Sequence, residues 1–498
     1  MNRRLFVQSS VAAAVACALP WSRLRALDEA ATLATGGIPA VKLDGSATVI
    51  EKAALKDLKA SLRGPLLLSG DAGYEDARRV LNRSIDRKPA LIVQPTGVAD
   101  IQNAVDFARE RELLVAVKCG GHSFGGKSTC DGGIQIDLSR LRGVRVDPVA
   151  RVAHVEGGSL LGEIDHETMA LGLATTTGTV SHTGVGGLTL GGGFGRLARR
   201  FGLAIDNLRA VDIVTADGRY LRADAEENAD LHWGVRGGGG NFGVVTNFEF
   251  DLHPMQRQVV GGDVVFPIER ARELLEFYAD YSASAPADVY VDAIMSAPPG
   301  GKPGVFILST CYSGPAGDAE RVLAPIRKLG TPIVDSIRPM DYVAIQRIHD
   351  QADPRNEGTY LKSGFIGDFK AAMIDAIVTG FQGHAERSTA LFFQHGGGAI
   401  GQVSADATAF PHRYAKHNML TLVSWPLEVD RTPHVNYLRG HWATLEPYAR
   451  GYYMNEVADE AQTVVDENYQ GNFDRMRAIK KKYDPINLFR LNANVRPA

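Results

Sequence analysis

The fold is decided by residues 118–126, Lys118-Cys119-Gly120-Gly121-His122-Ser123-Phe124-Gly125-Gly126. An apolar run at 113–117 precedes them and predicts a buried strand that ends where the glycines begin. Glycines at this point allow positive φ and let the backbone come close to a ligand. Successive N–H groups in such a turn form a concavity that suits a phosphate group. His122, at the tip of the turn, is a candidate for a core residue, a base, a metal ligand or an attachment point.

Two further glycine clusters follow in the same half of the chain, at 178–195 and 234–243. The earlier cluster opens with Gly178-Thr179-Val180-Ser181-His182-Thr183-Gly184, and the later one contains Gly237-Gly238-Gly239-Gly240-Asn241-Phe242-Gly243. No ordinary helix or strand tolerates so much glycine. We therefore expect backbone from all three clusters to pack closely around one large ligand.

Length and composition indicate a globular protein with more than one domain. The chain has 498 residues, of which 45% are hydrophobic and 22% charged, and it is too long for a single core. The formal net charge is −3 and basic residues do not cluster with aromatic ones, so we expect no nucleic-acid partner. Cys119, Cys130 and Cys311 are too widely spaced to predict a disulfide framework or a zinc site, and we expect no metal.

Residues 1–26 have the features of a twin-arginine signal peptide. Arg3-Arg4 is followed by an apolar stretch at 11–19 that is rich in small residues. A membrane anchor is the weaker alternative, because a spanning helix needs ~20 apolar residues. We expect export by the machinery for folded cargo, a periplasmic or secreted location, and no membrane span elsewhere.

The remaining pattern predicts an α+β protein. A strand at 89–95, an amphipathic helix at 96–111 and the strand at 113–117 form a β-α-β unit, which is typical of parallel strands. Beyond residue 260, helices alternate with short strands, which predicts a sheet with helices on one face. The helices are expected at 269–285, 318–329, 369–380 and 432–446, and the strands at 289–296, 305–312, 389–394 and 419–425. We place the domains at 27–255 and 256–450, followed by a C-terminal segment at 451–498.

The C-terminal segment contains a basic helix that ends at Asp484-Pro485. The three consecutive lysines Lys480, Lys481 and Lys482 are expected on a solvated face of this helix. Asn492 and Asn494, beyond the helix, are placed for hydrogen bonding.

Together these features resemble the berberine-bridge-enzyme-like group of FAD-linked oxidases, within the vanillyl-alcohol-oxidase superfamily. The motifs that carry the resemblance are 118–123, Gly184-Val185-Gly186-Gly187 with Gly191-Gly192-Gly193-Phe194-Gly195, Arg236 to Val245, and Lys482-Tyr483-Asp484-Pro485 with Asn487-Leu488-Phe489-Arg490. The resemblance implies a PCMH-type FAD-binding domain of two α/β subdomains and a substrate domain with an antiparallel sheet covered by helices. It also implies that the C-terminal segment returns to the FAD domain.

The resemblance implies FAD as the cofactor, bonded through its 8α carbon to a histidine at the position of His122. Many relatives have a second bond from a cysteine to flavin C6, but Val180 stands at that position and cannot form it. Thr183 stands where relatives tune the access of O2 to the flavin. The implied cofactor-binding positions are Lys118, Cys119, Gly120, Gly121, His122, Ser123, Phe124, Gly178, Thr179, Val180, Thr183, Gly184, Gly186, Gly187, Gly191, Gly243, Val244, Val245, Asn492 and Asn494.

The implied reaction removes a proton from a sugar, alcohol, phenolic or amine while hydride passes to flavin N5, and O2 or another carrier reoxidises the flavin. The family's Tyr-x-Asn-Tyr motif is Tyr453-Met454-Asn455-Glu456 here, so either Glu456 or Tyr453 is the base. His182 either contacts the substrate or caps its loop. Two rival hypotheses are a non-catalytic or acceptor-specific periplasmic flavoprotein and an NADPH-dependent reductase of the cell-wall precursor type.

Overall fold

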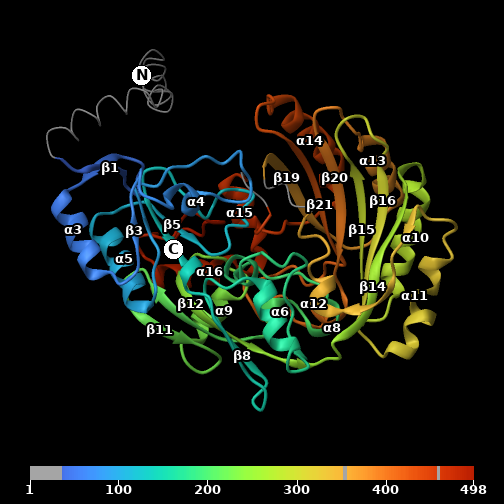
Figure 1. Ribbon diagram of the computed structural model, residues 1–498, viewed down its shortest axis with the longest axis horizontal. Helices are drawn as coiled ribbons and strands as arrows, with labels where there is room; N and C mark the ends of the chain where they lie inside the picture. Colours follow the sequence, from blue (N-terminus) through green and yellow to red (C-terminus); the bar gives the residue numbers. More distant parts are fainter. Residues whose placement is uncertain (1–35, 352–355, 457–459) are drawn as a thin grey trace, which may run out of the picture.

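The computed structural model describes residues 36–351, 356–456 and 460–498. The expected signal peptide at 1–26 lies outside these residues. The described chain forms an α+β fold with three principal sheets, as the sequence predicts (Figure 1). Within the described ranges, no helix combines the length and apolar character needed to cross a bilayer.

The smallest of the three sheets contains the predicted β-α-β unit. Its strand order is β3 (Leu66–Leu67), β4 (Leu91–Val93), β6 (Ile134–Asp137) and β5 (Val115–Lys118), with β6 parallel to both β4 and β5. Helix α5 (Val98–Glu110) connects β4 to β5 and buries Ile101, Ala104, Val105 and Ala108 against the sheet, because these residues recur at helical spacing. Strand β5 ends at Lys118, so the first glycine turn leaves the carboxyl end of a parallel strand.

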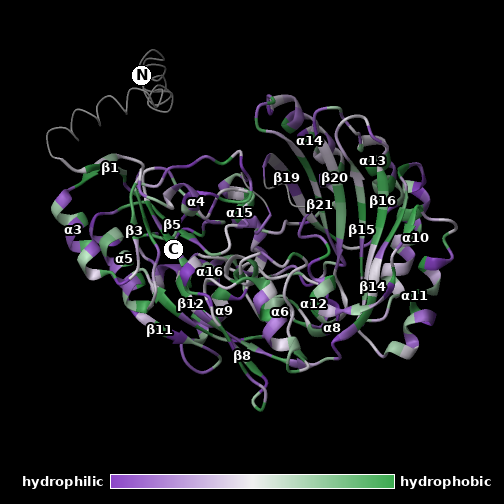
Figure 2. Ribbon diagram, in the orientation of Figure 1, coloured by the Kyte–Doolittle hydropathy of each residue, from purple (hydrophilic) through white to green (hydrophobic). Residues whose placement is uncertain are grey.

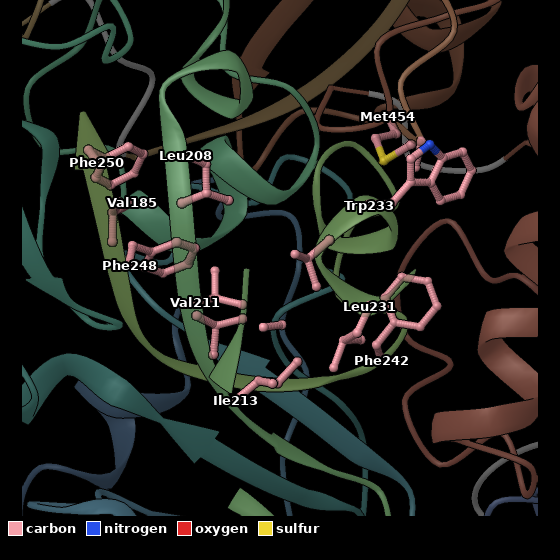
Figure 3. Close-up of a cluster of buried hydrophobic side chains, with 14 of the residues drawn as sticks. Val185, Leu208, Val211, Ile213, Leu231, Trp233, Phe242, Phe248, Phe250 and Met454 are labelled. Atoms are coloured by element: carbon pink, nitrogen blue, oxygen red, sulfur yellow. The ribbon is translucent and has the colours of Figure 1, made fainter. Parts of the chain in front are cut away.

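The second sheet is antiparallel and has the order β11 (Tyr220–Ala223), β10 (Leu208–Thr215), β12 (Gly243–Asp251), β8 (Val152–Glu156) and β7 (Val144–Asp147). Its hydrophobic side packs against α9 (Ala229–Val235), α6 (Leu161–Met169) and α16 (Phe473–Tyr483). Figure 3 shows part of this cluster, in which Phe248 and Phe250 of β12 lie near Leu208 and Val185. Met454 of the C-terminal segment belongs to the same cluster, so that segment returns to the first half of the chain.

The third sheet is antiparallel, and four helices cover one of its faces (Figure 1). Its order is β17 (Val334–Asp335), β14 (Gln258–Pro267), β16 (Val305–Tyr312), β15 (Val289–Ala297), β20 (Ser388–His395), β21 (His417–Pro426) and β19 (Glu357–Ile366), and β18 (Arg338–Asp341) also pairs with β14. The covering helices are α10 (Ala271–Ser284), α11 (Ala319–Arg327), α13 (Ala371–Gly380) and α14 (Thr432–Leu445). These bounds confirm the four predicted helices and four predicted strands to within a few residues, whereas β14, β17, β18 and β19 are not predicted by the sequence pattern. In Figure 2 the strands of this sheet are largely green (hydrophobic), whereas α10 and α11 alternate between green and purple (hydrophilic) residues.

The remaining regular elements are short. They are β1 (Ile38–Val41), β2 (Ala47–Ile50), α3 (Lys52–Ser61), α4 (Tyr74–Arg78), β9 (Leu173–Ala174), α7 (Val185–Leu190), α8 (Ala198–Phe201), β13 (His253–Pro254), α12 (Tyr342–Ile345) and α15 (Gln462–Asn468).

The expectation that Lys480 lies on a solvated face is wrong. Its side chain is fully buried, and Nζ lies 2.6 Å from Asp484 Oδ2 and donates to the carbonyls of Asn241 and Phe489 at 2.7 and 2.9 Å. Burial lowers the pKa of Lys480 to about 8, while Asp484 opposes that shift. The physical reason is that Lys480 shares the inward helix face with Met476 and Tyr483. The lysine therefore ties the C-terminal segment to the third glycine cluster.

Candidate active site

A cavity of about 920 Å³ lies between the glycine clusters and the uncovered face of the third sheet. One wall comes from residues 115–128, 179–190 and 239–248, and the opposite wall from strands β15, β20 and β21. Residues 453–456 connect the two walls, because Asn455 donates to the Leu188 carbonyl and Glu456 accepts from Asn418 of β21. The volume is near the upper end of the range for small-molecule and cofactor pockets. The three glycine clusters therefore surround one space, as the sequence predicts.

The first two glycine clusters touch through their backbones. A Cβ atom on Gly120 would lie 2.6 Å from the nitrogen of Gly184, and a Cβ on Gly184 would collide with Gly120 and Cys119. Gly121 has φ of 68°, a conformation that residues with a side chain rarely adopt. These positions need glycine because two loops meet there without space for side chains.

His122 lines the cavity, and the ring of His182 packs against it from the second cluster. The two ring centroids are 5.3 Å apart, and Phe124 contacts His122 edge-on at 5.5 Å. His182 itself is not part of the cavity lining. His182 therefore packs on His122 outside the cavity lining, and this geometry does not support a direct contact between His182 and the substrate.

Most of the predicted cofactor-binding residues line the cavity. They are Cys119, Gly120, Gly121, His122, Ser123, Phe124, Thr179, Val180, Thr183, Gly184, Gly186, Gly187, Gly243, Val245 and Asn492.

Five predicted positions lie outside the lining: Lys118, Gly178, Gly191, Val244 and Asn494. Lys118 is buried elsewhere, with Nζ donating to the Ala77 carbonyl at 2.6 Å. Gly191 makes space for the Asn455 side chain, which a Cβ would strike. Val244 belongs to the hydrophobic core around β4 and β5. Proximity in sequence to a glycine motif therefore does not ensure proximity to the cavity.

The cavity wall formed by the glycine clusters fits a large cofactor with many hydrogen-bonding groups. Gly187 and Gly240 both line the cavity, and a Cβ on either would meet no atom within 4 Å. Asn492 donates to the carbonyls of Gly240 and Phe489 at 3.0 and 3.1 Å, which holds the third cluster in place. Within the described residues, the Oδ1 atom of Asn492 and the Oγ atom of Ser128 are buried without a hydrogen-bond partner, and both residues line the cavity. A bound dinucleotide could approach the bare backbone closely and supply hydrogen-bond partners for the unsatisfied polar atoms.

Glu456 lies on the opposite wall in a dry environment. Its Oε2 accepts a hydrogen bond from Asn418 Nδ2 at 3.0 Å, and burial raises the pKa of its carboxyl to about 7. The same Asn418 amide donates to Gln394 Oε1 at 2.8 Å. Glu456 is therefore held by a strand of the third sheet and divides between its two protonation states near neutral pH.

Tyr453 also lines the cavity, but its hydroxyl is engaged with the glycine loop. The phenolic oxygen accepts hydrogen bonds from the Gly193 amide at 3.0 Å and from Asn455 Nδ2 at 2.8 Å. Burial raises the pKa of Tyr453, and the charge of Glu456 raises it further. The ring packs edge-on against Phe194 at 5.3 Å. Tyr453 thus connects the C-terminal segment to the second glycine cluster.

Several polar residues of the wall were not predicted from sequence. Asp292 and His349 both line the cavity, and burial raises the pKa of Asp292 to about 6. His349 Nε2 lies 3.5 Å from Asp263 Oδ2. Gln394 lines the cavity and pairs with Asn418 on the neighbouring strand, and this register lets the Asn418 amide bond both Gln394 and Glu456. In the described part of the chain, no group of three or more metal-binding side chains comes together.

The comparisons with known proteins agree with this arrangement. The chain matches a model of the FAD binding domain over residues 89–224 and a model of the berberine and berberine-like family over residues 452–496. It is 32% identical over 440 residues to an FAD-linked oxidoreductase of Dictyostelium discoideum, covering 88% of this chain and 95% of that protein.

Solved structures show the same fold. The crystal structure of 6-hydroxy-D-nicotine oxidase from Arthrobacter nicotinovorans superposes with a TM-score of 0.80 at 25% identity, covering 88% of this chain and 99% of that chain. A chitooligosaccharide oxidase superposes with a TM-score of 0.80 at 23% identity, covering 90% and 100% of the two chains, and indicates the fold alone. The α+β architecture is that of the PCMH-type FAD oxidases, and FAD is the cofactor of these relatives. This chain belongs to the berberine-bridge-enzyme-like family of FAD-linked oxidoreductases.

Proposed function

We propose that this oxidoreductase carries FAD bonded to His122 and uses Glu456 as the base that deprotonates an alcohol, sugar, phenolic or amine substrate. The observation that carries the proposal is the cavity itself. It brings the His122 turn and both other glycine clusters to one wall and a buried carboxyl with a pKa of about 7 to the other.

FAD, when bound, supplies the acceptor for the hydride of the substrate. The residues that would hold it are the glycine turn at 120–121, Gly187, Gly240 and Asn492, which offer bare backbone and amide groups to the cavity. Asn418 orients the Glu456 carboxyl by donating to Oε2. The carboxylate form of Glu456 then takes the proton from the substrate hydroxyl or amine, beside a wall to which Leu420, Leu422 and Phe392 contribute apolar side chains.

Of the two candidate bases, the geometry favours Glu456. A base must be deprotonated at the working pH, and Glu456, whose pKa burial raises to about 7, ionises near neutral pH. Burial and the neighbouring Glu456 charge raise the pKa of Tyr453, and the two N–H donors to its oxygen oppose that shift without cancelling it. We assign Tyr453 a positioning role at the glycine loop.

The absence of a thiol at Val180 supports attachment through His122 alone. Val180 lines the cavity, and Cys119, the one cysteine among the described lining residues, has its thiol pKa raised to about 11 by burial. A protonated thiol is a poor nucleophile. Cys119 Sγ instead donates to the Ser159 carbonyl at 3.6 Å.

The charge of the wall bears on the substrate. Asp292, Glu357 and Glu456 line the cavity, whereas Lys127 is the one lysine or arginine among its described lining residues. We therefore expect neutral or cationic substrates in preference to anionic ones. Relatives named as oxidases of a hydroxynicotine and of chitooligosaccharides fall within these classes. The electron acceptor is O2 or another carrier, and Thr183 at the cavity wall is the residue expected to influence that choice.

We propose further that residues 1–26 direct the folded, flavin-loaded protein to the periplasm or medium. The twin-arginine sequence supports this, since that route carries folded cargo.

A substrate screen tests the function. Purified protein should bleach its flavin colour anaerobically with at least one member of a sugar, alcohol, phenolic and amine panel, and O2 or an added carrier should restore the colour. A protein that stays yellow throughout the panel, or that oxidises NADPH in steady state, would contradict the proposal.

A further inference from the structure

The substrate domain holds the flavin-facing loop at 177–183 through one short segment, residues 346–350. Gln346 Nε2 lies 2.8 Å from Thr177 Oγ1 and 3.0 Å from the Gly178 carbonyl. Asp350 accepts hydrogen bonds from the Ser181 amide at 2.9 Å and from Ser181 Oγ at 2.6 Å. We call this set of contacts the clasp. It follows α12, which packs beside α6 of the FAD domain (Figure 1).

The clasp connects the cavity wall on the substrate side to the loop that carries His182. His349 and Gln351, on either side of Asp350, line the cavity wall. Ser181 precedes His182, whose ring packs on His122 at 5.3 Å between centroids. A chain of contacts therefore runs from the substrate wall through Asp350 and Ser181 to the ring behind His122.

We propose that Asp350 is a positioning residue for flavin attachment, acting through Ser181 and His182 on the orientation of His122. The inference rests on the proposed bond between His122 and FAD. The Asp350 side chain is mostly buried and lies 3.7 Å from Arg347 Nε, so its two bonds to Ser181 form in a partly dry setting. Hydrogen bonds to a charged acceptor are about twice as strong as neutral ones.

Attachment is sensitive to this positioning because bond formation requires the ring nitrogen and the 8α carbon in attack geometry. A misplacement of about 1 Å can cost a factor of about 100 in rate. Asp350→Ala removes both bonds to Ser181, whereas Ser181→Ala removes only the hydroxyl bond and keeps the amide bond. Asp350→Asn keeps an oxygen acceptor for the amide and a group that can bond the hydroxyl.

The test measures the fraction of flavin that stays with protein after acid precipitation, in freshly purified holoprotein. We expect Asp350→Ala to lower this fraction at least about threefold, Ser181→Ala to give an intermediate value, and Asp350→Asn to restore most of it. The matched control is Asp44→Ala. Asp44 accepts from the amide and hydroxyl of Ser46 at 2.8 and 2.6 Å, on a hairpin outside the cavity lining. This control should retain the full fraction.

Full covalent flavin in Asp350→Ala and Ser181→Ala, or an equal loss in Asp44→Ala, would overturn the positioning role. If Asp350→Ala does not yield folded protein, the other two variants decide the question. A lower fraction of covalent flavin in Ser181→Ala than in Asp350→Asn would support the positioning role, and equal fractions would contradict it. Unaltered protein without covalent flavin would instead overturn the proposed attachment at His122 and this inference with it. Covalent flavin in unaltered protein and in every variant overturns only the inference.

Discussion

Replacing Glu456 by glutamine should abolish most catalysis while making the protein more stable at alkaline pH. The amide keeps an oxygen that accepts from Asn418 Nδ2, so the wall keeps its shape while losing its base. A positioned general base contributes a factor of about 10²–10⁴. We expect Glu456→Gln to lower the rate of anaerobic flavin reduction by that factor with little change in substrate affinity.

The stability effect follows from the raised pKa. Glu456 has a pKa of about 7 in the folded protein, against 4.5 when unperturbed, so the folded state holds this proton more tightly than the unfolded state. The stability associated with Glu456 is fully present below pH 4.5 and is lost as pH rises through 7. The loss amounts to about 3 kcal/mol above pH 7. Glutamine does not titrate, so Glu456→Gln should unfold at higher denaturant concentration than the unaltered protein at pH 8, and the gain should disappear near pH 4.5.

The assay is stopped-flow flavin reduction with any substrate that the screen identifies, run from pH 5 to 9, beside denaturant unfolding at the two pH values. In the unaltered protein the reduction rate should rise with pH and level off above about 7, and this limb should be missing in Glu456→Gln. A variant that keeps the unaltered rate and the same pH limb would refute Glu456 as the base. If Tyr453→Phe lost the limb instead, the phenol would be the base.

Three further predictions concern residues in and around the glycine clusters. Lys480→Met leaves the Asp484 carboxylate buried without its cation and should cost about 3–5 kcal/mol of unfolding free energy, measured by denaturant titration, whereas exchange of the exposed Lys482 by Met should cost under about 1 kcal/mol. Gly184→Ala inserts a methyl group between the first two glycine clusters and should reduce the flavin content of purified protein, while Gly440→Ala, at an open position on α14 outside the cavity lining, should leave that content unchanged; equal content in both variants would contradict the close approach at Gly184. Val180→Cys places a thiol in the cavity wall and should add a second bond to flavin, which mass spectrometry would detect as flavin joining peptides from the first and second glycine clusters; unjoined peptides would count against this orientation of Val180.

Local patterns were sufficient to predict elements with strong periodicity. Helix α5 was expected at 96–111 and spans Val98–Glu110, because its apolar residues recur on one face. Strand β14 was missed because Gly261 and Gly262 interrupt its alternation, and they lie at points where a neighbouring strand or loop comes too close for a Cβ. Strand β19 carries polar residues and glycine along most of its length, so its sequence resembles a loop.

The candidate site could be predicted on the glycine side, whereas on the substrate side only Tyr453 and Glu456 could be predicted, from the family motif. Loop motifs keep their residues together in sequence, so His122 and Val180 could be assigned to one cavity from their motifs. Asn418 reaches Glu456 only through the pairing of β20 with β21, and register cannot be read from one strand alone. Lys480 was misassigned because three consecutive lysines hide the spacing that places one of them with Met476 and Tyr483. Helical spacing on that segment was the signal that could have found it.

The most direct test of the account is the mass of the tryptic peptide 119–127, which contains His122 between cleavage sites at Lys118 and Lys127. This peptide from the unaltered protein should carry the added mass of FAD, and the corresponding peptide from His122→Ala should carry none. An unmodified 119–127 peptide from yellow, unaltered protein would contradict the central claim.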